Sequence, residues 1–88
     1  MPYQVIFTDV ARRSLRDMPR HVQKRVNRWI DLLAEDPRRT GTRQLVGHPS
    51  IRRAHASKDY VILYTIEQHR ITIVVLLIEN RRDVYRGL

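Results

Sequence analysis

Arg53 and His55 are two basic side chains of different chemistry that stand two residues apart in the sequence. An arginine guanidinium pairs with phosphate through parallel N–H groups and stacks on nucleobases. A histidine changes its charge near neutral pH and is well matched to proton transfer. Such a pair has the chemistry to bind a phosphate and to transfer a proton. The alternative is a surface histidine beside a solvated arginine.

The charge of the whole chain favours the same kind of ligand. Lysine and arginine total 17 against 9 acidic residues, a formal net charge of +8, and only Lys24 and Lys58 are lysines. Codon usage in a GC-rich genome would explain the preference for arginine over lysine, but not the net charge. An excess of this size indicates a nucleic acid, an acidic membrane or an acidic protein partner. RNA is the polyanion that we expect.

Composition and apolar runs narrow the class of protein. The length of 88 residues allows a single domain over 1–88. Cysteine is absent, and His21, His48 and His69 lack the spacing of metal ligands, so we expect no metal and no cofactor. The longest apolar run, 73–78, is far too short to span a bilayer, and no signal peptide is visible. These features predict a cytoplasmic protein that makes no membrane contact.

The first 36 residues are expected to form a strand and two helices. Residues 3–7 alternate and are rich in β-forming types. Thr8 or Asp9 can cap a helix that reaches Met18. A second helix begins at Pro19 and ends by residue 36, because proline at 37 disfavours helical geometry just before it. Its apolar stripe consists of Val22, Val26, Trp29, Ile30 and Leu33, which we assign to the core.

The second half of the chain is expected to be β-structure. Residues 37–50 hold glycines, prolines and polar residues, which predicts a loop in which only Leu45 and Val46 pair briefly. Strands are predicted over 51–56, 60–66 and 70–78, with a hairpin turn at 67–69. This order predicts an α+β domain in which an N-terminal strand and a helical hairpin pack on a small antiparallel sheet.

The strand over 51–56 places the first functional residues on one face of that sheet. Arg53 and His55 share a face with Ile51, whereas Ala54 and Ala56 share the other face with Arg52. Two alanines allow a helix to approach closely, so we expect the helices on their side. Arg53 and His55 would then stand on the open face of the sheet.

The chain resembles the RelE/ParE superfamily of toxins from type II toxin–antitoxin pairs over nearly its whole length. The segments that carry the resemblance are Tyr3 to Thr8, Met18-Pro19, Asp36-Pro37-Arg38, Leu45-Val46-Gly47, Arg53-x-His55, Asp59 to Ile66 and Asn80 to Tyr85. Their order and spacing are more specific than any single segment. The resemblance implies a microbial-RNase-type fold and a cognate antitoxin that wraps around the toxin. RelE-like members cut mRNA on the ribosome, whereas ParE-like members poison DNA gyrase.

The resemblance also implies a catalytic set for metal-free RNA cleavage. That reaction needs a base for the 2′-hydroxyl, cations for the charged phosphorus and an acid for the leaving 5′-oxygen. The family site maps onto Arg53, His55, Arg81 and Tyr85, of which Tyr85 could stack on a base or take part in proton transfer. Further RNA contacts are expected from Arg43, Arg52, Lys58 and Arg82.

Three positions depart from the family pattern. Val61 stands where a basic residue is common, which removes one phosphate-stabilising cation. His55 replaces a lysine or arginine, and its ordinary pKa suits acid–base work better than theirs. Asn80 stands where many members carry histidine. The basic residues of the two helices, Arg12, Arg13, Arg16, Arg20, Lys24, Arg25 and Arg28, form a face that suits ribosomal RNA, solvent or an antitoxin.

These observations predict a toxin that inhibits translation as a ribosome-dependent mRNA endonuclease. The alternatives are a toxin that inhibits DNA gyrase by protein binding and a catalytically degenerate toxin that acts with its antitoxin as a co-repressor. In each case we expect a hetero-oligomer with an antitoxin whose acidic segment covers the arginines. Apolar helix burial should dominate that contact, so salt should weaken it only in part.

Overall fold

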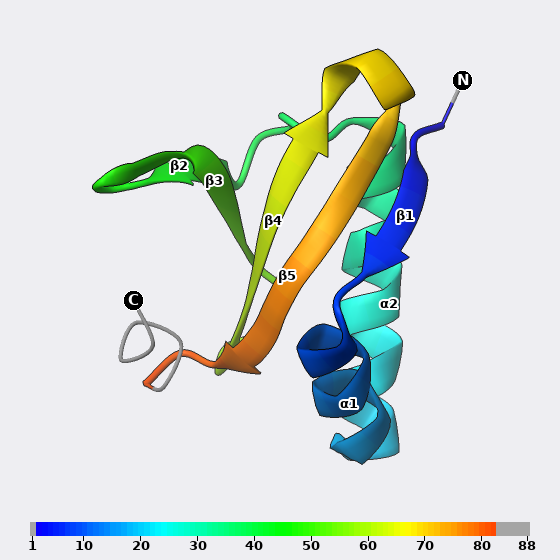
Figure 1. Cartoon of the computed structure of the whole chain (residues 1–88). Helices are drawn as coiled ribbons and strands as arrows, with labels where there is room; N and C mark the ends of the chain where they lie inside the picture. Colours follow the sequence, from blue (N-terminus) through cyan, green and yellow to red (C-terminus); the bar gives the residue numbers. More distant parts are fainter. Residues whose placement is uncertain (1, 83–88) are drawn as a thin grey trace.

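The computed structural model of the chain describes residues 2–82. Its elements are β1 (Gln4–Phe7), α1 (Asp9–Asp17), α2 (Arg20–Glu35), β2 (Thr42–Leu45), β3 (His48–His55), β4 (Tyr60–Glu67), a 3₁₀ turn (Gln68–Arg70) and β5 (Thr72–Asn80). The five strands form one sheet in the order β1-β5-β4-β3-β2, with both helices on one side of it (Figure 1). The predicted α+β class with a helical hairpin is confirmed.

The sheet is antiparallel except at its first strand. β2, β3, β4 and β5 pair antiparallel in succession, whereas β1 pairs parallel with β5. The parallel pair arises because the helical pair carries the chain from β1 across the sheet, and the meander then returns to β1 at β5. Backbone N–H groups of Gln4 and Thr8 donate to the carbonyls of Ile71 and Val75 at 2.9 and 3.0 Å and mark the two ends of this pair.

The loop predicted over 37–50 is wrong for its second half. Residues from Thr42 form β2, which pairs with β3 through a tight turn at Val46 and Gly47. Gly47 has a φ of +81°, a conformation that side-chain-bearing residues rarely adopt. The sequence of β2 is Thr-Arg-Gln-Leu, and this polar edge strand lacks the apolar alternation by which strands are recognised.

Local hydrogen bonds fix both ends of α1. The Thr8 hydroxyl accepts from the backbone N–H of Ala11 at 3.1 Å, so Thr8 rather than Asp9 is the cap. At the other end, the Gln23 side-chain amide donates to the carbonyls of Leu15 and Arg16 at 2.7 and 3.1 Å. A residue of α2 therefore satisfies the last carbonyls of α1 and sets the angle between the two helices.

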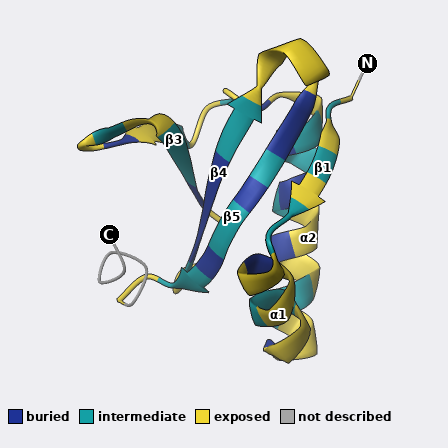
Figure 2. Cartoon of the chain, in the orientation of Figure 1, coloured by how far each residue is buried: buried dark blue, intermediate teal, exposed yellow. Residues whose placement is uncertain are grey.

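Two apolar clusters lie on opposite faces of the sheet, and the buried residues are concentrated along β4 and β5 (Figure 2). The larger one joins the helices to the sheet and includes the buried Val26, Leu33, Ala54, Ala56, Ile62, Tyr64 and Ile73, with Trp29 packed against it and half-buried. The smaller one lies on the open face and consists of Leu45, Val61 and Leu63 with Ile51 and Leu77 beside them. The open face is therefore partly closed by the curled β2–β3 hairpin.

The β4–β5 turn differs slightly from the prediction. A 3₁₀ turn occupies Gln68–Arg70, and Ile71 adopts the left-handed conformation with φ 48°. Because four residues are used in turning, β5 begins at Thr72 rather than at 70 and continues to Asn80. This shift of two residues along the chain brings Arg81 to the same end of the sheet as His55.

Candidate functional site

The alternation of β3 separates its side chains as predicted. Ala54 and Ala56 are buried in the cluster under the helices, whereas Ile51 belongs to the cluster on the open face. Arg53 and His55 share the face of Ile51, opposite Leu63 and Val61 of β4. The two candidate residues therefore border the small apolar cluster, with Arg53 half-buried and His55 exposed.

Arg53 and His55 are joined by a hydrogen bond. Nη1 of Arg53 lies 3.1 Å from Nε2 of His55. A guanidinium can only donate, so Nε2 accepts and the ring proton resides on Nδ1. Partial desolvation, then the positive charges of Arg53 and Arg81, lower the pKa of His55 below its ordinary value of 6.5. His55 is therefore a neutral imidazole at neutral pH and suits the role of a proton acceptor.

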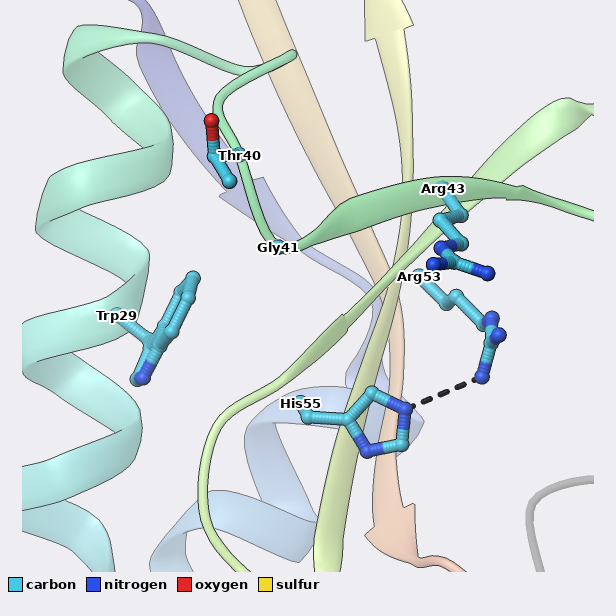
Figure 3. A pocket seen from close by; sticks show the side chains of 6 residues that line it. All are labelled: Trp29, Thr40, Gly41, Arg43, Arg53 and His55. Carbon is cyan, nitrogen blue, oxygen red and sulfur yellow. Dashed lines mark hydrogen bonds between the residues drawn. The ribbon is translucent and has the colours of Figure 1, made fainter.

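A hollow of about 540 Å³ opens beside this pair (Figure 3). It is lined by Trp29, Thr40, Gly41, Arg43, Arg53 and His55. Arg43 of β2 is the register partner of Arg53, so two guanidinium groups stand side by side on one face. Like charges on paired strands repel one another, and an anion between them would relieve that repulsion. The arrangement suits a phosphate group.

A second hollow of about 660 Å³ lies around the start of β4 and the end of β5. It is lined by Lys58, Asp59, Asn80, Arg81 and Arg82. The backbone N–H of Arg81 donates to the carbonyl of Asp59 at 2.6 Å, which anchors this turn to the sheet. Because the charge of Arg81 acts on His55, the two hollows belong to one basic surface.

Two predicted residues do not join this set. Arg52 lies on the other face of β3, where its guanidinium donates to the Thr42 hydroxyl at 2.8 Å. It lines a separate small hollow with Arg38 and Ser50. Tyr85 falls outside the described residues. The structure thus brings together Arg43, Arg53, His55 and Arg81, with Lys58 and Arg82 beside Arg81.

Two of the three departures from the family pattern, Val61 and Asn80, have structural roles. Val61 has no exposed surface and belongs to the cluster on the open face, so it fills a buried apolar position between His55 and Glu79 in the register. Asn80 accepts the backbone N–H of Arg82 through Oδ1 at 3.0 Å and shapes the turn after β5. Val61 thus packs the cluster and Asn80 stabilises the turn, and neither side chain carries a charge.

Two residues near the site escaped the sequence reasoning. Trp29 was assigned to the core, and it does pack there, but its indole also lines the hollow beside His55. Glu79 faces Val61 from β5 and lies two residues before Arg81. The alternation along β5, in which Leu77 and Glu79 share a face, could have placed Glu79 on the open face.

The basic face of the helices is exposed. Its ion pairs are weak surface contacts, Arg12 with Asp9 at 3.9 Å and Arg16 with Asp17 at 3.5 Å. Within residues 2–82, no three histidine or acidic side chains gather as a metal site would require. No helix in that range is long and apolar enough to cross a membrane.

Solved structures share this fold. The toxin–antitoxin complex RelBE2 of Mycobacterium tuberculosis matches with a TM-score of 0.80 and 29% identity, over 92% of this chain and all of that chain. The isolated RelE toxin of E. coli matches with a TM-score of 0.78 and 20% identity, over 97% of this chain and 93% of that one. Two helices packed on one face of a five-stranded, mostly antiparallel sheet place the chain in the class of RelE-like toxin folds.

Sequence comparison identifies the family. The ParE toxin of type II toxin–antitoxin systems matches residues 5–85. Toxin RelG of Mycobacterium tuberculosis is 37% identical over 90 residues, which cover 98% of this chain and 99% of RelG. The chain belongs to the RelE/ParE superfamily and is a toxin of a type II toxin–antitoxin system.

Proposed function

We propose that this toxin is a ribosome-dependent endoribonuclease that cleaves mRNA by attack of a 2′-hydroxyl on the adjacent phosphate. The observation that carries the proposal is the hydrogen bond of 3.1 Å from Arg53 to the His55 imidazole, whose pKa is lowered by desolvation and by the charges of Arg53 and Arg81. A proton acceptor between two phosphate-binding cations matches the needs of this reaction. The expected RelE-like activity of the family points the same way.

His55 is the proposed base. Its Nε2 lone pair accepts from Arg53. A bound phosphate would draw the guanidinium toward itself, because a charged acceptor makes the stronger hydrogen bond. Nε2 would then be free to take the proton of the 2′-hydroxyl. The 2′-oxygen forms its bond to phosphorus as the bond from phosphorus to the 5′-oxygen breaks.

In this proposal, arginines stabilise the charge of the transition state, and a tyrosine protonates the leaving group. Arg53 and Arg81 would bind the phosphate oxygens, on which negative charge accumulates in the transition state. Of the two roles expected for Tyr85, stacking on a base or proton transfer, we propose the second, with its hydroxyl as the donor to the leaving 5′-oxygen. The products are a 2′,3′-cyclic phosphate and a free 5′-hydroxyl, with His55 holding the proton taken from the nucleophile. Lys58, Arg43 and Arg82 would hold the flanking phosphates, and Arg52 would contact RNA from the other face.

The proposed partners are the ribosome, its mRNA and a cognate antitoxin, and the proposed place of action is the cytoplasm. Structural relatives were solved as complexes with RelB antitoxins, from Mycobacterium tuberculosis and Pyrococcus horikoshii among others. A net charge of +8 makes an acidic antitoxin segment a suitable cover for the arginines.

Inhibition of DNA gyrase is a second candidate, favoured by Val61. A fully buried valine stands where nuclease members commonly carry a cation, and it fills an apolar cluster that leaves no room for one. A purified-gyrase supercoiling assay separates the two candidates, since a nuclease leaves supercoiling unchanged. A co-repressor without toxin activity would neither stop growth on induction nor inhibit supercoiling by gyrase.

The test of the nuclease proposal is induction in cells, with transcript ends mapped by primer extension. We expect cuts within translated codons, lost in His55→Ala and Arg81→Ala but kept in His69→Ala and Arg70→Ala. The two control residues are exposed and lie in the β4–β5 turn, at the opposite end of β5 from Arg81. Growth arrest with intact transcripts would rule the nuclease out.

A further inference from the structure

We propose that Trp29 forms a nucleobase subsite, in which one base of the RNA stacks on the indole while its phosphate is held by Arg53 and Arg43. The inference rests on the proposed function and deepens it, because it identifies the position at which the bound RNA places one of its bases. It starts from the hollow of about 540 Å³ that Trp29 shares with Arg43, Arg53 and His55. Ligand pockets commonly have volumes of about 300–1,000 Å³.

The indole is positioned for stacking rather than only for packing. Trp29 projects from α2 toward the strands and stands across the hollow from His55 (Figure 3). It is half-buried, so part of the ring packs on the core while part lines the hollow. Aromatic rings beside basic side chains are the usual means by which proteins hold single-stranded RNA, since every base offers a flat face.

Gly41 keeps the rim of the indole uncovered. A Cβ atom at this position would lie 3.3 Å from Cη2 of Trp29, so any side chain there would press against the ring and enter the hollow. The residue has a φ of +97°, which also favours glycine. Gly41 thus serves both the turn before β2 and access to the tryptophan.

Arg39 and Tyr64 hold this corner in place. The guanidinium carbon of Arg39 lies 5.6 Å from the centroid of the Trp29 ring, within the range of a cation–π contact. The hydroxyl of the buried Tyr64 donates to the carbonyl of Pro37, which ties the chain after α2 to β4. The segment that leads to Gly41 is therefore anchored at two points, Pro37 and Arg39, which positions the subsite without a ligand.

Trp29 is the single tryptophan of the chain, so its fluorescence reports directly on this subsite. The probe is a four-nucleotide 2′-O-methyl RNA, which binds as RNA but has no free 2′-hydroxyl to attack. We expect saturable quenching of Trp29. A matched oligomer with the same phosphates and no bases should bind at least about tenfold more weakly, because stacking on an aromatic ring accounts for that much affinity per base.

A matched pair of glycine variants separates blockage of the subsite from backbone strain. Gly41→Ala and Gly47→Ala both force a methyl group onto a positive φ, but the position at Gly47 has open space around it. Gly41→Ala should weaken binding of the probe about tenfold, whereas Gly47→Ala should bind as the unaltered toxin does. Trp29→Leu should lower the affinity of the toxin for ribosome-bound mRNA more than Tyr3→Leu does. Tyr3→Leu is the control, because it removes another half-buried aromatic side chain of the same cluster.

The outcomes distinguish the subsite from the nuclease activity. Cleavage that depends on His55, with no quenching by the probe, would overturn the subsite and leave the nuclease standing. Saturable quenching without cleavage of ribosome-bound mRNA would support the subsite and reject the nuclease. Equal quenching by the oligomer without bases would overturn the subsite, because only phosphate would then be recognised. Quenching by an acidic antitoxin peptide but not by the RNA probe would also overturn it, since the ring would serve the protein partner.

Discussion

Nη1 of Arg53 donates to Nε2 of His55 across 3.1 Å, between two side chains on the same face of β3. The contact reserves the imidazole lone pair for an acceptor role and holds the guanidinium beside the hollow. One hydrogen bond therefore places the proposed base and the proposed phosphate-binding cation side by side. The sequence spacing alone could not predict this contact, because side chains two residues apart on a strand share a face but need not touch.

The first prediction concerns the pKa of His55. Desolvation and the charges of Arg53 and Arg81 hold it below 6.5, so Arg53→Gln should raise it by removing one of the two charges. Arg70→Gln, which removes a charge in the distant β4–β5 turn, should leave it unchanged. Proton NMR of the imidazole C–H signals across pH measures all three proteins. A pKa at or above 6.5 in the unaltered toxin would contradict the assignment of His55 as a neutral base.

The second prediction is the pH dependence of cleavage. A base works only when deprotonated, so kcat/KM should rise with pH through the lowered pKa of His55 and level off above it. His55→Gln should lower the rate about 10²–10⁴-fold and remove this ionisation. His69→Gln serves as the control, since His69 is exposed in the β4–β5 turn. Single-turnover cleavage of ribosome-bound mRNA at constant ionic strength is the measurement, and an unchanged profile in His55→Gln would exclude it as the base.

The third prediction concerns the hydrogen bond from Tyr64 to Pro37. Tyr64 is fully buried, and Tyr64→Phe would leave the Pro37 carbonyl without this donor. We expect a loss of about 1–3 kcal/mol in the free energy of unfolding, measured by urea denaturation. Tyr60→Phe is the control, because Tyr60 is partly exposed and its hydroxyl makes no hydrogen bond within residues 2–82. Equal stability of the two variants would show that the bond contributes nothing.

The fourth prediction concerns the missing cation. Val61→Lys would place a charge in the apolar cluster with Leu45 and Leu63, and should cost about 2–5 kcal/mol of stability. Val46→Lys is the matched substitution at the tip of the β2–β3 hairpin, where the valine is 95% exposed, and should change stability by about 0.5 kcal/mol or less. Thermal unfolding of both variants measures the difference. A stable Val61→Lys would mean that the cluster opens easily and that the position can accept the family's cation.

The fifth prediction concerns the antitoxin. If apolar helix burial dominates the contact, raising salt from about 0.1 M to 1 M should weaken binding only in part, although it shortens the Debye length from about 10 Å to 3 Å. Binding of a short RNA to the same surface should fall far more steeply, because it depends on phosphate contacts. Isothermal calorimetry of both ligands provides the comparison. Equally steep loss would assign the antitoxin contact to charge alone.

The sequence by itself determined much of the fold and the face of the site. The period of 3.6 residues from Val22 to Leu33 and the alternation from Arg52 to Ala56 depend on local geometry, so they could be recognised without neighbours. That alternation was sufficient to place Ala54 against the helices and Arg53 on the open face.

Only the tertiary structure decided which residues meet. The polar strand β2 takes its place from pairing with β3, a contact that its own sequence does not encode. Arg81 approaches His55 because β3 and β5 end, and β4 begins, at the same end of the sheet. Arg52 is excluded because its side of β3 faces the helices. Trp29 looked like core because helical periodicity records which face is apolar. Helical periodicity does not show that the turn at Gly41 leaves part of the Trp29 indole lining a hollow.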